Sequence, residues 1–269
     1  MPKAAMMVGG GRFGNQLFRY WATQLLCYLH GHEFCGNNVS MLCNPIEVND
    51  KMYIESICDK SFADTRRDLI VTGYCQNFDI FGNLYRTFVK QLMSSSNTYE
   101  LYDGICINQL HEAMDQSMFV LRPKDIVIHV RLDDFIQEAW SLKFSYYKEA
   151  LGERSQWDRI IIVTDCLRTD AERSYVGKLI QSLGGEVIIH QGTMLEDWRL
   201  LRRAKNIIAS NSTFAWTALI AGEAEFAVIP KDNCIAHQII VPIKSISRCV
   251  VLNAGVSVER NMQQWGERL

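Results

Sequence analysis

Apolar residues in the second half of the chain fall into short runs that alternate with helix-like segments. The runs predict five buried strands, at Ile126–Val130, Ile160–Val163, Val187–Ile189, Ile207–Ala209 and Ala227–Ile229. The segments between them predict four helices, at Ser145–Leu151, Thr169–Leu183, Leu195–Lys205 and Phe214–Ala221. Strands that alternate with helices of this length predict a doubly wound parallel sheet, as in a Rossmann lobe.

The first half of the chain has weaker periodicity. Short strands are expected at residues 4–8 and at Leu69–Gly73, and a helix at Asn83–Met93. A longer helix is predicted where apolar residues recur with a period near 3.6, at Leu17, Trp21, Leu25 and Leu29, before His30 and Gly31 end it. We therefore expect a second, more irregular α/β lobe in this half.

The chain is long enough for two lobes. With 269 residues and 48% hydrophobic content, it can bury a sizeable core. The polar segment around 94–125 is expected to cross between the lobes. This gives an N-terminal α/β lobe over residues 1–120 and a C-terminal Rossmann-like lobe over residues 121–269.

Composition excludes several classes of protein. The formal net charge is −2 and no long basic run occurs, so no nucleic-acid partner is expected. Charged or polar residues interrupt every window long enough to span a bilayer, which predicts no membrane span. The nine cysteines are scattered and form no Cys-x-x-Cys pair, which indicates reduced intracellular thiols rather than disulfides or a zinc site.

A glycine-rich segment, Gly9–Gln16, lies between the first predicted strand and the first long helix. Such a turn, followed by a helix N-terminus, presents backbone N–H groups to an anion such as a phosphate. The same letters satisfy Gly-x-Gly-x-x-Gly, and Glu33 lies about 20 residues further on, which also fits a dinucleotide-binding dehydrogenase. A tight turn that binds no ligand is the third interpretation.

Polar residues follow three of the strands predicted in the second half. They are His129, Arg131, Asp133 and Asp134 at the first strand, Asp165 at the second, and residues 210–213 at the fourth. Because ligands bind beyond the carboxyl ends of parallel strands, we expect these residues to line one binding edge. The guanidinium of Arg131, with the hydroxyls and N–H groups of Ser212 and Thr213, would then clamp a diphosphate.

Each of these residues also has a purely structural interpretation. Arg131 can pair with Asp133 or Asp134 at the surface. The segment 211–213 can cap the helix that follows, which does not exclude ligand binding. His129, inside an apolar run, can be a core histidine with satisfied hydrogen bonds.

Four separated segments carry motifs that occur together in one family of enzymes. Residues 11–18 (GRFGNQLF) are similar to Gly-Arg-(Leu/Phe)-Gly-Asn-Gln, and residues 73–76 (GYCQ) to Gly-Tyr-Phe-Gln. Residues 129–135 (HVRLDDF) resemble His-x-Arg-Arg-x-Asp, and residues 210–216 (SNSTFAW) resemble Ser-Asn-Ser-Ser-Phe-Ser-Trp. Together these segments resemble the GDP-fucose-dependent fucosyltransferase superfamily, most of all the α-1,2-fucosyltransferases, with a likeness that extends to the protein O-fucosyltransferases.

One position departs from these motifs. Leu132 stands where His-x-Arg-Arg-x-Asp has its second arginine. The first arginine, which the resemblance places on the β-phosphate, is kept as Arg131. The departure bears on the strength of nucleotide binding or the identity of the donor more than on the class of reaction.

The resemblance implies a GT-B-like α/β fold of two Rossmann-type lobes with the active site in the cleft. It implies inverting transfer of L-fucose from GDP-fucose to a hydroxyl of a glycan or oligosaccharide acceptor, α-1,2 to a galactose-like sugar. The C-terminal lobe would hold the donor and the N-terminal lobe the acceptor. Arg131 would stabilise the charge on the departing GDP, assisted by Asn15 and the Gly11–Gly14 turn.

Further site residues follow from the same resemblance. Asp134 would orient the arginine or contact the sugar. Asp165 and Asp197 would recognise guanine or ribose, although Asp197 also suits the first turn of a helix. Phe214 and Trp216 would pack their helix onto the sheet. The other residues expected to bind the nucleotide sugar are Gly11, Arg12, Phe13, Gly14, His129, Asn211, Ser212, Thr213 and Phe214.

No metal is expected. The sequence has no Asp-x-Asp motif, and Asp133 and Asp134, as consecutive strand residues, would point to opposite faces. Transfer should therefore survive EDTA. For a general base, Glu33, His32 and Asp79 are candidates by position alone, and a mechanism in which the departing phosphate takes the proton stays open.

Two other function classes stay open beside transfer of fucose. One is an NAD(P)-dependent oxidoreductase that uses the glycine turn, with Glu33 on the ribose. The other is a non-catalytic module that binds a sugar nucleotide or a glycan. Animal members of the superfamily carry a membrane anchor before their first motif, whereas this chain begins almost at that motif, so we expect a cytoplasmic location.

Overall fold

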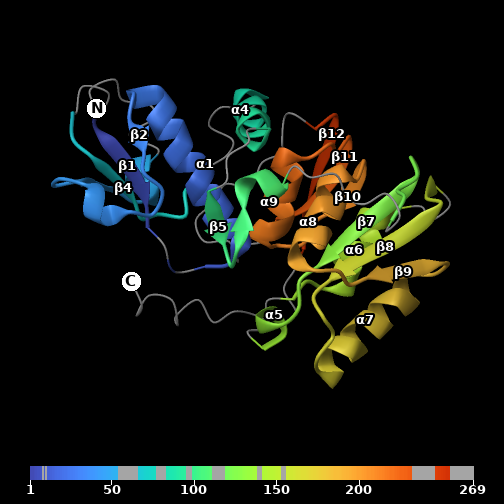
Figure 1. Cartoon of the computed structure of the whole chain (residues 1–269). Coiled ribbons are helices and arrows are strands. Elements are labelled where there is room, and N and C mark those ends of the chain that lie inside the picture. Colours follow the sequence, from blue (N-terminus) through green and yellow to red (C-terminus); the bar gives the residue numbers. More distant parts are fainter. Residues whose placement is uncertain are drawn as a thin grey trace. The chain divides into compact units, whose positions relative to one another are not determined.

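A computed structural model describes residues 1–7, 9, 11–53, 66–76, 83–94, 99–110, 119–137, 141–152, 156–231 and 246–254. These residues divide into two compact units, each built on its own parallel sheet (Figure 1). The first unit contains the described residues up to Phe119 together with Thr213–Gly222, and the second contains the rest. The boundary expected after residue 120 lies next to this division, but the helix expected at Phe214–Ala221 belongs to the first unit instead of the second.

The sheet of the first unit has four parallel strands in the order β2-β1-β4-β3. They are β1 (Lys3–Met6), β2 (Glu33–Phe34), β3 (Ile46–Val48) and β4 (Leu69–Val71). Helix α1 (Phe13–His30) follows the glycine turn and packs against β1. It ends where predicted, because Gly31 takes a left-handed φ of 67° and donates its N–H to the carbonyl of Cys27.

The apolar stripe of α1 is buried over three of its four predicted positions. Leu17 and Trp21 are 0% exposed and Leu25 is 6% exposed, whereas Leu29 in the last turn is 39% exposed. A short 3-10 turn, η1 (Val39–Met41), follows later in the chain.

Helix α4 (Asn83–Met93) has its predicted bounds. The segment that follows was expected to be a polar crossing, but it contains a two-stranded antiparallel hairpin and a 3-10 turn, β5 (Glu100–Tyr102), β6 (Ile105–Cys106) and η3 (Ile107–Leu110). Asp103 and Gly104 join the hairpin with φ values of 45° and 77°. Two left-handed residues between the strands are the type I′ turn that an Asp-Gly pair favours.

Helix α9 (Thr213–Ala221) completes the first unit by packing on α1 and α4. Its residues from Ala215 to Ala221 are all buried, as its apolar sequence requires. The Arg86 guanidinium of α4 donates to the carbonyl of Gly222, just beyond the end of α9. Helix α9 therefore packs on helices of its own unit, and the prediction that Phe214 and Trp216 pack it onto the sheet stays a prediction.

The second unit contains a six-stranded, wholly parallel sheet in the order β12-β11-β10-β7-β8-β9. Its strands are β7 (Asp125–Val130), β8 (Arg159–Thr164), β9 (Val187–His190), β10 (Asn206–Ile208), β11 (Phe226–Lys231) and β12 (Arg248–Asn253). Five of them were predicted, and β12 was missed. Numbered along the chain, the strands have the order of a dinucleotide-binding Rossmann sheet, so the predicted doubly wound fold is confirmed.

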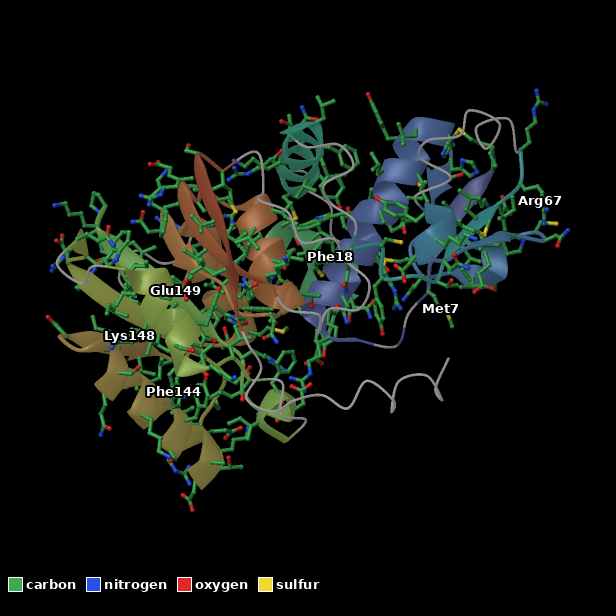
Figure 2. The ribbon with its side chains drawn as sticks, turned by 180° about the vertical axis from the view of Figure 1, so that it is seen from behind. Met7, Phe18, Arg67, Phe144, Lys148 and Glu149 are labelled. Atoms are coloured by element: carbon green, nitrogen blue, oxygen red, sulfur yellow. The ribbon has the colours of Figure 1, made fainter. Side chains whose placement is uncertain are left out.

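Helices α5 (Asp134–Gln137), α6 (Phe144–Leu151), α7 (Asp170–Leu183) and α8 (Met194–Arg203) connect these strands. A capping box starts α7 and another starts α8, with Thr169 and Glu172 in the first and Thr193 and Glu196 in the second. Figure 2 labels Phe144 on α6, and its ring lies 4.8 Å from the ring of Tyr175 on α7. The capping boxes and the ring contact stabilise α6, α7 and α8, which connect the strands that carry the candidate site.

Candidate functional site

The order in which strands are added to the sheet of the second unit changes direction between β7 and β10, which are neighbours in the sheet although β8 and β9 lie between them in the sequence. His129 on β7 and Ser210, just beyond β10, meet at this point. A hydrogen bond of 2.7 Å joins His129 Nδ1 to Ser210 Oγ, and both residues are buried. Open parallel sheets bind their ligands outside the carboxyl ends of the strands at such a switch point.

Arg131 leaves the carboxyl end of β7 beside this pair. Its Nη1 donates to both carboxylate oxygens of Asp165, at 3.0 and 2.9 Å, and its Nη2 donates to Asp134 Oδ1 at 2.9 Å. Asp133 Oδ2 lies 4.0 Å from the same Nη2. The Arg131 side chain is 10% exposed, and the three carboxylate side chains are 39 to 41% exposed.

Arg131 thus pairs with Asp133 and Asp134, which was the structural interpretation of this residue, and it also pairs with Asp165. Asp134 accepts a hydrogen bond from the guanidinium, and its role in orienting the arginine or contacting the sugar stays a prediction. Asp134 also begins α5, and both neighbouring carboxylates approach Arg131, so the expectation that Asp133 and Asp134 point to opposite faces of a strand is wrong. A phosphate that binds Arg131 must take over contacts that Asp165 and Asp134 make here.

Leu132, which replaces the second arginine of the motif, is turned into the core. It is 0% exposed and belongs to the cluster that contains Ile126, Ile128 and Tyr146. Asp133 follows it with a left-handed φ of 51°, which directs the chain back to the edge. Because the side chain at position 132 points into the core, the change from arginine to leucine there leaves the charge at the edge occupied by Arg131 unaltered.

Asp197 lies in the first turn of α8, near the end of β9. Its Oδ1 accepts from the backbone N–H of Gly192 at 2.9 Å and lies 3.2 Å from His190 Nε2. These contacts belong to the helix start that was the alternative interpretation of this residue. Its carboxylate is also close enough to oppose the effect of burial on the pKa of His129.

Burial lowers the pKa of His129 from 6.5 to about 4. Between these pH values the unfolded chain binds a proton that the folded protein does not, so stability should decrease as the pH is lowered from 6.5 towards 4, by up to about 1.4 kcal/mol per pH unit. Above pH 6.5 this group should have no effect. Urea unfolding measured from pH 4 to 7.5 should show this loss of unfolding free energy at low pH in the wild type and a smaller loss in His129→Gln. An equal dependence on pH in the two proteins would contradict the lowered pKa of His129.

The fourth motif is divided between the two units. Asn211 and Ser212 are buried in the second unit beside Ser210, whereas Thr213 and Phe214 belong to the first. The Phe214 ring lies 5.8 Å from the ring of Phe13 at the start of α1. Four residues that were predicted to bind the nucleotide sugar therefore lie where α1 packs on α9. They are Phe13, Gly14, Thr213 and Phe214.

The closest approach between the two helices is at Gly14. A Cβ on it would lie 2.6 Å from the backbone of both Thr213 and Phe214. Phe13 is 1% exposed and also lies edge-on to Tyr102, so its side chain belongs to the core. Arg12 is exposed and precedes the first residue of α1 as its N-cap, without a side-chain capping bond.

A second polar cluster lies at the carboxyl edge of the first sheet, where the glycine turn follows β1. Gly11 has a φ of 89°, and a Cβ on it would lie 2.3 Å from Asn15 Nδ2, so only glycine fits. Asn15 Oδ1 accepts from Gln76 Nε2 at 3.0 Å, which joins the first motif to the second. Arg19 of α1 donates hydrogen bonds to the carbonyls of Gly9 and Gly73 in the same two segments. Sequence reasoning missed it, although it is a lone charge in an apolar window.

The candidate bases are placed away from this cluster. Glu33 begins β2 and is aligned with Lys3 at the start of β1, so it lies at the opposite edge of the sheet from the glycine turn. His32 is buried there, and its Nε2 lies 2.9 Å from the carbonyl of Arg67. Asp79 lies outside the described residues. A dinucleotide needs its acidic residue at the carboxyl end of β2, so the placement of Glu33 removes the support for an oxidoreductase.

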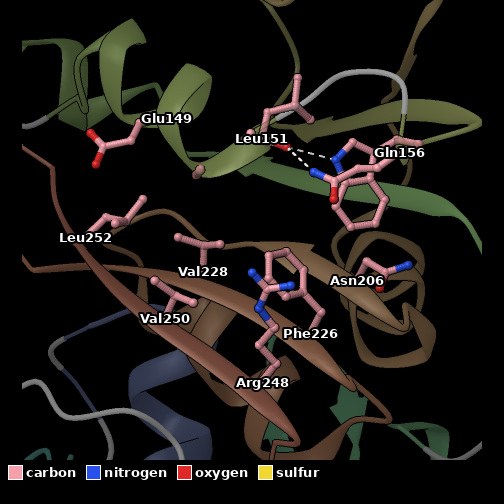
Figure 3. Close-up of a pocket in the computed structure, with 12 residues that line it drawn as sticks. Glu149, Leu151, Gln156, Asn206, Phe226, Val228, Arg248, Val250 and Leu252 are labelled. Atoms are coloured by element: carbon pink, nitrogen blue, oxygen red, sulfur yellow. Dashed lines mark hydrogen bonds between the residues drawn. The ribbon is translucent and has the colours of Figure 1, made fainter.

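A pocket of about 450 Å³ lies elsewhere in the second unit (Figure 3). Phe226, Val228, Arg248 and Val250 line one side of it, and Leu151 at the end of α6 lines another. Phe226 and Arg248 are the first residues of β11 and β12, so this pocket lies near the amino ends of the strands. It is therefore distinct from the Arg131 edge.

The described residues contain no group of three or more His, Cys, Asp or Glu side chains arranged to hold a metal ion. None of the helices that they form has both the length and the apolar character to cross a bilayer.

Comparison with solved structures finds chains similar in fold, among them FUT1, fucosyltransferase NodZ and POFUT1. FUT1 of Arabidopsis thaliana, a mutant form in complex with GDP, is 13% identical; the match covers 85% of this chain and 70% of that chain, with a TM-score of 0.49. Fucosyltransferase NodZ from Bradyrhizobium is 12% identical, with 82% and 93% covered and a TM-score of 0.38. POFUT1 in complex with GDP is 12% identical, with 84% and 73% covered and a TM-score of 0.38.

No protein-family model matches the chain, and no curated protein matches it. The similarities to solved structures are weak and concern the fold. The function is therefore argued from the motifs of this chain and the placement of their residues.

Proposed function

We propose that the protein is an inverting glycosyltransferase that moves L-fucose from GDP-fucose to a hydroxyl of a glycan acceptor. The observation that carries the proposal is the meeting of motif residues at the switch point of the second sheet. His129 and Ser210, from two separate motifs, share a hydrogen bond there, and Arg131 lies beside them. A Rossmann sheet with an arginine side chain at its switch point is suited to bind a nucleoside diphosphate.

In the proposed reaction, the second unit binds GDP-fucose and the first unit binds the acceptor. As the bond between fucose and the β-phosphate breaks, negative charge develops on the diphosphate, and Arg131 stabilises it. Asp165 and Asp134 hold the guanidinium in place until the phosphate replaces part of their contacts. The acceptor is a galactose-like sugar, and the new linkage is α-1,2, as the sequence resemblance implies.

Transfer is proposed to need no metal, because Arg131 supplies the positive charge that a divalent cation would otherwise bring. No cofactor takes part, since GDP-fucose is a substrate. We place the reaction in the cytoplasm, a reducing compartment that suits the nine scattered cysteines of the sequence.

Calorimetric titration of the purified chain with GDP, GDP-fucose and NAD(P), each with and without EDTA, tests the proposal. We expect GDP and GDP-fucose to bind equally well in both conditions, NAD(P) not to bind, and EDTA to leave transfer to galactosides intact. Binding of NAD(P) alone would restore the oxidoreductase. Binding of GDP-fucose without transfer to any acceptor would indicate a binding module, and inactivation by EDTA reversed by Mg²⁺ or Mn²⁺ would contradict metal independence.

A further inference from the structure

Arg19 is an arginine of α1 whose residue is 4% exposed. All three nitrogens of its guanidinium donate to backbone carbonyls. The acceptors are Gly73 (3.1 Å from Nε), Gly9 and Met7 (2.6 and 3.3 Å from Nη1) and Thr72 (3.2 Å from Nη2). The ring of Tyr74 covers the guanidinium, with 4.6 Å from its carbon to the ring centroid.

These four carbonyls belong to two neighbouring loops. The strands β1 and β4 are paired with Met6 opposite Val71, and each loop begins directly after its strand. One planar guanidinium therefore ties together the glycine turn and the segment 72–76 at the carboxyl edge of the first sheet. A lysine carries its donors on a single nitrogen and cannot reach the same set of acceptors.

Gln76 lies in the second of these loops, and Asn15 lies in the first turn of α1, directly after the glycine turn. Asn15 Oδ1 is engaged by Gln76 Nε2 at 3.0 Å, which sets the orientation of the Asn15 amide and places its Nδ2 next to Gly11. A shift of the segment 72–76 relative to the start of α1 would break this hydrogen bond and release the amide. The orientation of the Asn15 amide thus depends on loops that the Arg19 guanidinium joins to α1.

We propose that Arg19 is a positioning residue for substrate binding in the first unit. It holds the glycine turn and the segment 72–76 in register, so that Asn15 and Gln76 present amide donors and acceptors to the hydroxyls of the acceptor sugar. This role rests on the proposed function, in which the first unit takes the acceptor. Arg19 is buried and acts through the two amides.

The test compares Arg19→Lys with Arg86→Lys in the whole chain. Arg86 is the matched control, because it is an arginine of the same unit that donates to a backbone carbonyl, that of Gly222, outside the two loops. We expect Arg19→Lys to lower kcat for transfer about 10- to 100-fold, the scale for a misplaced group. It should also raise KM for the acceptor and leave GDP affinity unchanged, whereas Arg86→Lys should keep wild-type constants.

Equal kinetics for the two lysine variants would overturn the proposal. Should Arg19→Lys fail to fold, Gln76→Ala removes the same restraint on Asn15 and is expected to lower kcat with little change in Tm; an unchanged kcat would overturn the proposal as well. Hydrogen exchange of residues 9–16 and 72–76 should be faster in Arg19→Lys than in Arg86→Lys. Unchanged exchange rejects the role of Arg19, whereas a wild-type protein that binds no GDP rejects the proposed function.

Discussion

Arg131→Ala is expected to reduce fucose transfer by about 10²-fold or more, the effect of removing one donor that stabilises charge in a transition state. The guanidinium is fixed at the switch point by Asp165 and Asp134, so little reorganisation is needed before it acts on the diphosphate. The loss should appear in kcat from steady-state kinetics and in the affinity for GDP from calorimetry. A rate near that of the wild type would reject this role of Arg131.

A second arginine on the same sheet provides the control. Arg159 donates to both carboxylate oxygens of Asp125, at 3.0 and 2.5 Å, at the amino ends of β8 and β7. Arg131→Lys and Arg159→Lys each keep the positive charge and lose the guanidinium that donates to both oxygens of a carboxylate. We expect only Arg131→Lys to impair transfer, because Arg159 lies at the opposite edge of the sheet from the site.

Gly14→Ala is expected to destabilise the protein by about 1–3 kcal/mol, the usual cost of overpacking. The new methyl group would lie 2.6 Å from the backbone of Thr213 and Phe214, which cannot move without moving α9. Alanine would otherwise favour the helix by about 1 kcal/mol, so the clash decides the sign of the effect. Thermal unfolding should show a fall of about 2–4 °C in Tm for each kcal/mol.

Gly177→Ala is the matched control for this substitution. Gly177 lies within α7, and a Cβ on it would meet nothing within 4 Å. Here the same change should stabilise the protein by up to about 1 kcal/mol. If Gly14→Ala proved as stable as Gly177→Ala, the close packing of α1 on α9 would be contradicted.

Sequence reasoning succeeded where the signal is local. Buried parallel strands are continuous apolar runs, and β7 and β8 were found within one or two residues of their ends for that reason. The glycine that ends α1 and the threonine that caps α7 are similarly explicit. Strand β12 was missed although its run Cys249–Leu252 is as apolar as those of the strands that were found; it is only partly buried along its length. The hairpin signal Asp103-Gly104 was present and was not used.

Contacts between distant loops could not be predicted. The carboxylates that surround Arg131 come from the loops after two different strands, and Asp133 reaches it through a left-handed φ of 51° that no spacing reveals. The same holds for Asn15 and Gln76, which are far apart in sequence and joined by one hydrogen bond. Motif likeness indicated which residues matter, whereas their partners depend on loop conformations set by the folded sheet.

The grouping of α9 with the first unit has a consequence for biosynthesis. Ribosomes deliver the chain from its N-terminus, so the segment up to Phe119 emerges well before Thr213–Gly222. Until that helix arrives, the face of α1 around Gly14 lacks the neighbour that closes it. The strands of the second unit up to β10 are made in this interval. The unit that begins first during translation can therefore complete its core only after most of the other has been synthesised.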